Sequence, residues 1–381
     1  MKTIISEATE LRKYLHAHPE VSSQEQQTSA YLKNLIRHHC TYDELIEFEN
    51  YGFAVVFNGE KKGQSILVRA DFDALPIQEI NDFDHRSTVS GVSHKCGHDG
   101  HASILYGLAR SFSENPLISG QAILLFQPAE ENGEGAQGIV HDPKFEKLSP
   151  DYAVALHNLP GYPLHEIVIR EGSFTAAANS IIIMLSGKTS HAAEPEMGIN
   201  PALAMAEITQ KILEQTEPDL NQEDFRIATP VCSQMGEKAY GVSAGFGELH
   251  FTLRAWSNDV MQDFEKQCKS IAEEVAQKYG LGVSIDWTES FFANINQPDV
   301  VKAIEKAAHS EGFSISNRST PFKWGEDFGL FTERFPGAMF GIGSGENCPA
   351  LHNPDYDFPD EILETGIRMF SQVIKNLTVH V

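Results

Sequence analysis

Residues 94–101 read His-Lys-Cys-Gly-His-Asp-Gly-His and gather one thiol, three imidazoles and a carboxylate in eight positions. Thiolate and imidazole together suit a cation such as Zn²⁺ or Co²⁺ better than Mg²⁺ or Ca²⁺. The next residues, about 102–113, carry the apolar periodicity of a helix. The stretch therefore predicts metal ligands on a loop that leads into the N-terminus of a helix, a common place for chemistry.

Three other segments have the composition of buried strands, at 64–71, 122–126 and 152–156. Helical segments between some of them favour an α/β fold, with a mixed, largely parallel sheet and helices on both faces. Polar side chains follow each strand: Asp71 and Asp73 the first, Glu130 and Glu131 the second, and His157 the third. Because ligands of such sheets bind beyond the carboxyl ends of the strands, these segments predict one metal site at that edge.

A late histidine, His352, adds a further ligand type to this set. Two cations about 3.5–4 Å apart could share one bridging ligand and hold a water between them. Glu130 and Glu131 are adjacent, so on a turn they can divide the work. One would bind metal, and the other would act as the general base on the water.

The sequence pattern changes after about residue 172. Strands are predicted at 180–185, 226–234, 247–255 and 282–288, and helices at 201–214 and 260–279. This β-α-β-β-α-β order matches the split ferredoxin-like motif. We therefore expect an inserted α+β domain over residues 175–290. Residues 1–174 and 291–381 would form the metal-binding domain.

The overall composition argues against several classes of function. The 381 residues carry a formal net charge of −24, which disfavours nucleic acid or an anionic membrane as a partner. No window reaches the ~18 apolar residues of a membrane span, and the N-terminus lacks the apolar stretch of a signal peptide. Five scattered cysteines do not form the pattern of a disulfide framework. We expect a cytoplasmic protein with reduced thiols.

Seven motifs carry a resemblance that spans essentially the whole chain. They are Leu-Arg-Lys-Tyr-Leu-His-Ala-His-Pro-Glu from residue 11, Arg-Ala-Asp-Phe-Asp-Ala-Leu-Pro from 69, Cys-Gly-His-Asp-Gly-His from 96, Phe-Gln-Pro-Ala-Glu-Glu from 126, Ser-Gly-Lys-Thr-Ser-His-Ala-Ala from 186, Gly-Glu-Asp-Phe from 325 and His-Asn-Pro from 352. With these motifs the chain resembles the metal-dependent amidohydrolases of the aminoacylase/carboxypeptidase clan. The branch it is most similar to contains the hippurate hydrolases and the auxin-conjugate amidohydrolases.

The resemblance implies a fold, a reaction and a ligand set. The implied fold is a zinc-exopeptidase-like catalytic domain with an inserted ferredoxin-like domain that serves as lid and dimerisation surface. The implied reaction is cleavage of the amide bond of a small N-acyl amino acid or similar conjugate, by water that two divalent transition-metal ions (Zn, Mn, Co or Ni) activate. The implied metal ligands are Cys96, His98, Glu131, His157 and His352, with Cys96 as the bridge.

Three more residues receive roles from the resemblance. Glu130 matches the general base, and Asp73 matches an acid beside the metals that orients a ligand. His191 matches a histidine that crosses a dimer interface and stabilises the oxyanion, so the resemblance implies a homodimer. Two departures lie on the substrate side and leave the substrate open. Gly241 stands where the family usually has Asn, and Glu194-Pro-Glu follows His191-Ala-Ala where the family usually has Pro-His.

Several other polar residues allow two interpretations, a role in the site or a role in the scaffold. For His101 we favour hydrogen bonding over metal binding, and for Asp99 a helix cap over a ligand. The choices left open are ligand or neighbour of a ligand for Asp71, site element or helix start for Glu326 and Asp327, and substrate contact or ion pair for Arg254. The histidines expected to be exposed on helices are His16, His18, His38 and His39.

Three alternative functions accompany the amidohydrolase hypothesis. A metallo-exopeptidase would use the same metals on dipeptides or C-terminal residues, and a substrate panel separates the two. A non-catalytic binding protein would retain the fold, although the intact ligand set argues against it. A thiol hydrolase would use Cys96 and His98, and its activity would survive chelation but not thiol alkylation.

Overall fold

The computed structural model describes residues 1–378, which divide into two compact units. The first unit comprises Met1–Phe174, Asn294–Ser319 and the chain from Glu326 onward, and the second comprises Thr175–Ala293 and Thr320–Gly325. The sequence placed residues 320–325 in the first domain. They belong to the second unit because the backbone N–H of Ala176 donates hydrogen bonds to the carbonyls of Phe322 and Trp324.

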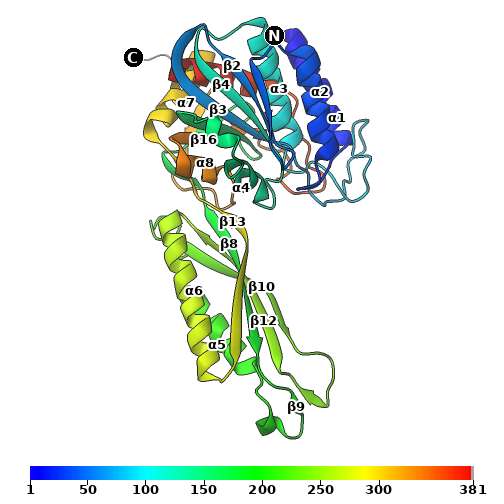
Figure 1. Ribbon diagram of the computed structural model, residues 1–381, viewed down its shortest axis with the longest axis vertical. Coiled ribbons are helices and arrows are strands. Elements are labelled where there is room, and N and C mark those ends of the chain that lie inside the picture. Colours follow the sequence, from blue (N-terminus) through cyan, green and yellow to red (C-terminus); the bar gives the residue numbers. More distant parts are fainter. Residues whose placement is uncertain (379–381) are drawn as a thin grey trace. The chain divides into compact units, whose positions relative to one another are not determined.

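The first unit is built on an eight-stranded sheet (Figure 1). Its strands, in spatial order, are β1 (Glu44–Glu47), β2 (Phe53–Asn58), β4 (Ser119–Gln127), β3 (Lys61–Asp71), β5 (Tyr152–Leu159), β16 (Gly337–Gly343), β6 (Ile167–Ile169) and β15 (Ile315–Asn317). The central strands β4, β3, β5 and β16 run parallel to one another. At one edge β2 pairs antiparallel with both β4 and β1, and on the other side β6 pairs antiparallel with β16. The predicted mixed, largely parallel sheet is confirmed.

Helices cover both faces of this sheet. They are α1 (Lys2–Ala17), α2 (Gln26–His39), α3 (His98–Glu114), α4 (Glu134–Val140), α7 (Pro298–Glu311), α8 (Gly329–Arg334) and α9 (Ile362–Thr378), with a 3-10 turn, η1, at Phe145–Lys147. Successive residues of a strand point to opposite faces, and Ile66, Leu67 and Val68 are all fully buried. Both faces of the sheet are therefore covered. Among residues 1–378, no helix combines the length and the apolar character that crossing a membrane requires.

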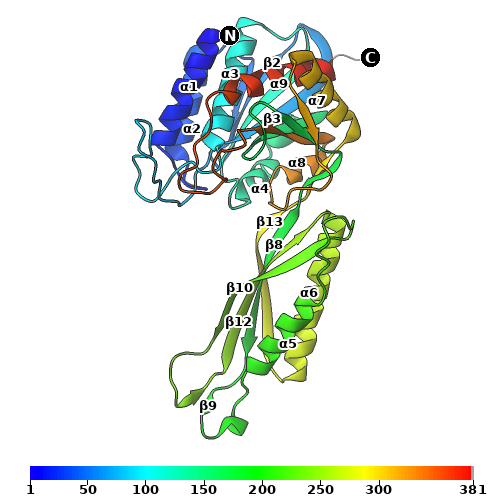
Figure 2. The same cartoon turned by 180° about the vertical axis from the view of Figure 1, so that it is seen from behind.

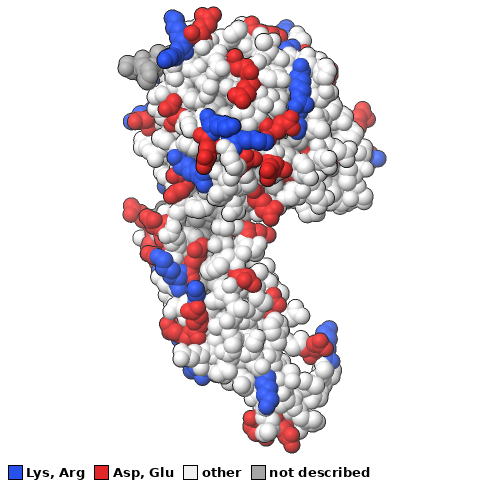
Figure 3. Space-filling model, viewed as in Figure 1, with Lys and Arg blue, Asp and Glu red and all other residues white. Residues whose placement is uncertain are grey.

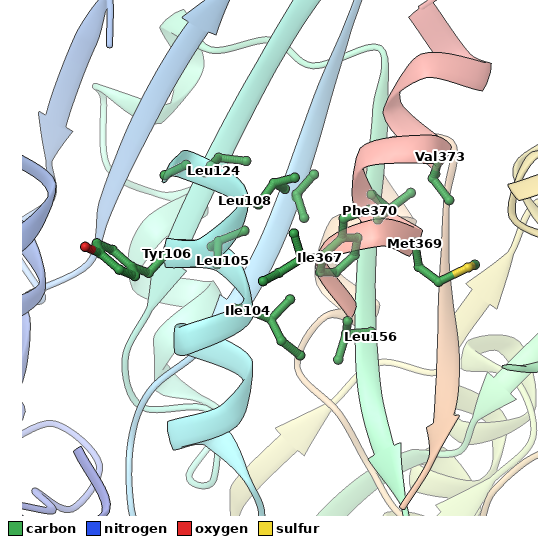
Figure 4. Close-up of a cluster of buried hydrophobic side chains, with 14 of the residues drawn as sticks. Ile104, Leu105, Tyr106, Leu108, Leu124, Leu156, Ile367, Met369, Phe370 and Val373 are labelled. Atoms are coloured by element: carbon green, nitrogen blue, oxygen red, sulfur yellow. The ribbon is translucent and has the colours of Figure 1, made fainter. Parts of the chain in front are cut away.

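The core between α3 and α9 fixes the helix that begins at the 94–101 stretch. Ile104, Leu105 and Leu108 of α3 meet Ile367 and Phe370 of α9 over strands β4 and β5 (Figure 4). Each of these side chains is fully buried. Burying a large aliphatic or aromatic side chain contributes roughly 1.5–3 kcal/mol. The cluster therefore holds α3, and with it the first residue of the helix, His98.

The second unit is a four-stranded antiparallel sheet with helices (Figure 2). Its strand order is β10 (Arg226–Met235), β12 (Phe246–Ala255), β8 (Ala177–Ser186) and β13 (Gly282–Phe291), and its helices are α5 (Ala202–Leu213) and α6 (Asn258–Lys278). Buried and less buried positions alternate along β12, as expected for a sheet with one covered face. Along the chain the elements follow the β-α-β-β-α-β order.

Short elements complete the two units. In the second unit, β9 (Ser190–His191) pairs with β11 (Val242–Ser243), and a 3-10 turn, η2, covers Pro195–Met197. A second two-stranded pair joins β7 (Gly172–Thr175) and β14 (Asn294–Asn296). On the face drawn in Figure 3, Lys and Arg side chains lie among Asp and Glu side chains in both units.

Candidate metal centre

The carboxyl ends of the central strands deliver the predicted ligands to one edge of the sheet. Glu130 and Glu131 follow β4, and His157 is the third residue from the carboxyl end of β5. Cys96 precedes α3, whose first residue is His98, and His352 lies in the loop between β16 and α9. This is where α/β sheets bind ligands.

The predicted ligands form two groups that share one residue. Cys96, His98 and His157 each place a ligand atom within 4.8 Å of the others, and Cys96, Glu131 and His352 do the same. Cys96 Sγ lies 3.6 Å from His157 Nε2, and His352 Nε2 lies 3.5 Å from Glu131 Oε1. The structure thus brings all five predicted ligands together, with Cys96 common to both groups.

Two buried atoms show that this donor set suits cations. Among the described residues, His98 Nε2 and Glu131 Oε1 have no hydrogen-bond partner, although both atoms are inaccessible to solvent. They lie 3.9 Å from each other. An unpartnered buried polar atom is costly, and coordination of a cation removes that cost. Sulfur, nitrogen and oxygen ligands together fit a divalent transition metal.

The charges around the centre also favour cations. Burial raises the pKa of the Cys96 thiol well above its ordinary value, and the carboxylates of Glu131 and Glu130 raise it further. Burial alone would lower the pKa of His98, but Asp71 and Asp73 outweigh it and raise the pKa to about 10. These shifts favour the protonated forms of Cys96 and His98. Metal binding would release the proton of the Cys96 thiol, because the thiolate is the ligand.

Asp73 contacts two of the ligand residues, as its predicted orienting role requires. Its Oδ1 lies 3.1 Å from His98 Nδ1, and its Oδ2 accepts a hydrogen bond from the backbone N–H of Glu131. Ser22 Oγ donates to the same Oδ2 at 2.7 Å. Burial alone would raise the pKa of Asp73, but the hydrogen bond with His98 lowers it. Hydrogen bonds to the residues that ligate a metal orient those residues.

Arg69 is a buried charged residue beside the candidate site that the sequence reasoning missed. Its guanidinium is fully buried at the end of β3 and pairs with Asp71, with Glu326 at 2.9 Å and with Asp327 at 2.6 Å. The carboxylates of Glu130, Glu326 and Asp327 are close enough to hold a cation, but Arg69 already neutralises two of them. The available signal was an arginine inside the apolar run of a predicted buried strand.

Glu130 lies between the metal ligands and the Arg69 cluster. Its Oε2 is 3.9 Å from His98 Nε2, and its Oε1 accepts a 3.3 Å hydrogen bond from the backbone N–H of Asp327. Burial raises the pKa of Glu130 well above its ordinary value, with further contributions from Glu326 and Glu131. A carboxyl group with a raised pKa can both accept and return a proton near neutral pH.

Contacts show how His101 and Asp71 are held. His101 Nδ1 lies 2.6 Å from Asp71 Oδ1 and its Nε2 lies 2.5 Å from Asn158 Oδ1, so hydrogen bonds occupy both ring nitrogens, as predicted. Asp71 is likewise occupied by His101 and Arg69 and is a neighbour of the ligands. Glu326 and Asp327 pair with Arg69 beside the candidate site, and Glu326 also accepts a hydrogen bond from the backbone N–H of Phe328 at the start of α8, so both interpretations keep support.

Among the described residues Arg254 forms no ion pair, so the alternative of a strand-end ion pair is not supported. Its guanidinium donates a 2.8 Å hydrogen bond to the backbone carbonyl of Lys323.

Two sequence predictions are wrong. Asp99 is not the N-cap residue, because α3 begins at His98 with Gly97 in that position, although Asp99 Oδ1 does accept a hydrogen bond from the backbone N–H of Gly100 in the first turn. His16 is fully buried, whereas the sequence placed it among exposed histidines. The two errors have one cause, since His16 Nδ1 pairs with Asp99 Oδ2 at 2.8 Å across 83 residues of sequence. His18, His38 and His39 are exposed, as predicted.

His191 lies in the second unit, on the two-stranded pair of β9 and β11. Its side chain is exposed, and its Nδ1 accepts a hydrogen bond from the backbone N–H of Ala193. Gly241, the position of the missing Asn, adjoins it, because the N–H of Ala192 donates to the Gly241 carbonyl. A side chain at Gly241 would enter open space.

Known proteins resemble this chain over nearly its full length. A profile of peptidase family M20/M25/M40 matches residues 67–376. The N-acetyldiaminopimelate deacetylase of Exiguobacterium sibiricum is 30% identical over 356 residues, which cover 93% of this chain and 94% of that protein. The N-acetyl-L-cysteine deacetylase of Bacillus subtilis is 28% identical, over 90% of this chain and 82% of that protein.

A solved structure supports the metal count and the assignment. The YXEP protein of Bacillus subtilis, a dinuclear metal-binding peptidase of the M20 family, superposes with a TM-score of 0.83 at 25% identity and full coverage of both chains. With the two ligand groups that share Cys96, this likeness supports two divalent metal ions as the cofactors. The resemblance drawn from the motifs is confirmed, and the chain belongs to peptidase family M20/M25/M40.

Proposed function

We propose that this protein is a two-metal amidohydrolase that cleaves the amide bond of an N-acyl amino acid or a similar small conjugate. One observation carries the proposal. Cys96 belongs to two groups of ligand atoms at once, and the buried carboxyl of Glu130 lies beside both. A pair of cations with a proton acceptor next to them is the arrangement that metal-assisted hydrolysis needs.

The proposed ligands are Cys96, His98, Glu131, His157 and His352. When bound, the two ions would polarise the scissile carbonyl and lower the pKa of a water molecule. Glu130 then accepts the proton of the attacking water on its carboxylate and returns it to the leaving amine. Asp73 holds the ring of His98 and the backbone of Glu131 in place, so that neither ligand must reorganise during the reaction.

The substrate and the second unit belong to the same proposal. The deacetylase names of two relatives favour an acetyl group on an amino acid. His191 would stabilise the oxyanion, reaching the centre of a partner subunit in a homodimer. The second unit would act as lid and dimerisation surface, and the metal would be Zn, Mn, Co or Ni. Free thiols at all five cysteines support a cytoplasmic location.

An exopeptidase is the second candidate, because the YXEP protein is described as a peptidase. Both candidates need the same metals and the same base. They differ in whether the amide lies between an acyl group and an amino acid or between two amino acids.

One experiment tests the proposal and ranks the candidates. Purified protein is analysed for metals, and hydrolysis of N-acyl amino acids and dipeptides is measured before chelation, after chelation and after metal is restored. We expect close to two transition-metal ions per chain and cleavage of N-acyl amino acids that chelation abolishes and metal restores. Faster cleavage of dipeptides would favour the exopeptidase. Activity that survives chelation but not alkylation would favour the thiol hydrolase. No metal and no turnover would leave a binding protein.

A further inference from the structure

Lys95 contacts both ends of the short segment that carries His352. Its backbone carbonyl accepts a 2.7 Å hydrogen bond from the backbone N–H of His352. Its Nζ, at the other end of a fully buried side chain, donates to the carbonyl of Tyr356 at 2.7 Å. Because Lys95 directly precedes Cys96, one residue connects the chain that carries the shared ligand with the loop that carries the last one.

The ammonium group of Lys95 also contacts a third segment, the loop that contains Glu79. Its Nζ lies 2.5 Å from Glu79 Oε1, which His16 Nε2 also approaches at 2.9 Å, and Glu79 Oε2 accepts a hydrogen bond from the backbone N–H of Ser87. The loop after Glu79 contacts the His352 segment directly, since the N–H of Ile80 donates to the carbonyl of Pro354. The buried ammonium therefore lies at the junction of three loops.

The imidazole of His352 is the least buried of the three predicted histidine ligands. Its side chain is 50% exposed, in contrast to the fully buried His98. Its backbone adopts a φ of +64°, a left-handed conformation that residues other than glycine rarely occupy. Such a conformation costs of the order of 1–3 kcal/mol and persists only when the surroundings impose it.

We propose that Lys95 is a positioning residue for the metal site formed by Cys96, Glu131 and His352. It acts through His352: the ammonium and the carbonyl of Lys95 fix the loop from both ends and hold the imidazole toward Glu131. The inference rests on the proposed function, which makes His352 a metal ligand. Loss of a group that orients a metal ligand weakens metal binding by about 10- to 100-fold.

The test uses Co²⁺ as the probe, bound to the full chain. Cobalt-loaded protein is mixed with excess EDTA, and the loss of visible absorption is followed with time. Two ions in unlike ligand groups are expected to leave in two kinetic phases. We expect Lys95→Met to accelerate one phase by about 10- to 100-fold and to leave the other unchanged. His352→Ala should accelerate the same phase, and Lys62→Met, which removes an exposed lysine, should change neither.

The combination of the two substitutions separates positioning from general loosening. If Lys95 acts through His352, Lys95→Met adds nothing to that phase in the His352→Ala background. A further acceleration there, an equal effect on both phases, or no effect at all of Lys95→Met would overturn the inference. If Lys95→Met does not fold, Glu79→Gln weakens the same contact without removing the lysine and must accelerate the same phase.

The outcome for His352→Ala distinguishes the two proposals. If it leaves both phases unchanged, His352 is not a ligand, and the proposed metal site fails together with the inference. If His352→Ala accelerates one phase and Lys95→Met accelerates none, the metal site stands and only the role of Lys95 is refuted.

Discussion

Glu25 provides the sharpest prediction on stability. It lies at the N-terminus of α2, and its Oε1 accepts a 2.7 Å hydrogen bond from the backbone N–H of Ala129, the residue before Glu130. Among the described residues its Oε2 has no partner, although the side chain is fully buried. Burial, with a smaller contribution from Asp73, raises the pKa of Glu25 to about 8. The perturbation is Glu25→Gln, which keeps the acceptor and cannot ionise.

The direction of the change in stability with pH follows from the pKa of Glu25 in the unfolded and in the folded chain. Below the ordinary value of 4.5, Glu25 is protonated in the folded and the unfolded chain, and it costs nothing. Between 4.5 and about 8 the unfolded chain ionises and the folded chain does not, so stability falls as the pH rises. The full gap corresponds to about 5 kcal/mol, at about 1.4 kcal/mol per pKa unit. Exchanging the acid for an amide as the acceptor of the Ala129 N–H offsets about 1 kcal/mol of this.

Calorimetric unfolding at two pH values tests this reasoning. At pH 5 we expect Glu25→Gln to match the parent protein within about 1 kcal/mol. At pH 8.5 the variant should be more stable by about 4 kcal/mol, or roughly 5–10 °C in Tm for a unit of this size. Glu10→Gln, at an exposed position of α1, is the control and should shift Tm at neither pH. An equal or lower Tm of Glu25→Gln at pH 8.5 would show that the carboxylate is charged in the folded protein and refute the argument.

Three further predictions concern the site and its support. Glu130→Gln should keep both metals and lose turnover by about 10²–10⁴-fold, since it removes the general base; metal analysis and kcat check this, and near-normal turnover would contradict the mechanism. Arg69→Met leaves three buried carboxylates without their cation, so urea unfolding should show a loss of about 3–5 kcal/mol, and an unchanged midpoint would contradict the role of the cluster. Gly100→Ala would place a Cβ 2.3 Å from the ring of Phe358. We expect the free energy of unfolding to fall by about 1–2 kcal/mol, because the clash exceeds the gain in helix propensity. A raised Tm would show that the ring moves freely.

Much of the fold could be predicted because local patterns and tertiary packing agree. The strands β3, β4 and β5 are apolar runs, and the helices α1, α3 and α6 have one apolar face, so their period alone identified them. The central strand β16 was not predicted, because its sequence, Gly-Ala-Met-Phe-Gly-Ile-Gly, contains three glycines, which have poor strand propensity. Close packing in the folded protein explains one of these glycines, because a Cβ at Gly341 would lie 2.0 Å from the side chain of Leu159.

The candidate site was likewise only partly predictable from local sequence. Its ligands follow predicted strands or stand in a compact motif, so strand order and residue type together were sufficient to propose them. The buried pairs around it were missed, because Arg69 meets Asp327 across 258 residues and His16 meets Asp99 across 83. No local pattern in one sequence shows such partners. A charged side chain in an apolar segment indicates only that a partner must exist.

The order of the pieces along the chain has a consequence for synthesis on the ribosome. Residues 175–293 hold every strand and helix of the second unit, so a nascent chain can fold that unit while the first still lacks α7, β16 and α9. Cys96, His98 and His157 have emerged by then, but His352 has not. During translation the chain can offer one ligand group complete and the other without its last member. If His352 is a metal ligand as proposed, the second ligand group is complete only after the loop that follows β16 has left the exit tunnel.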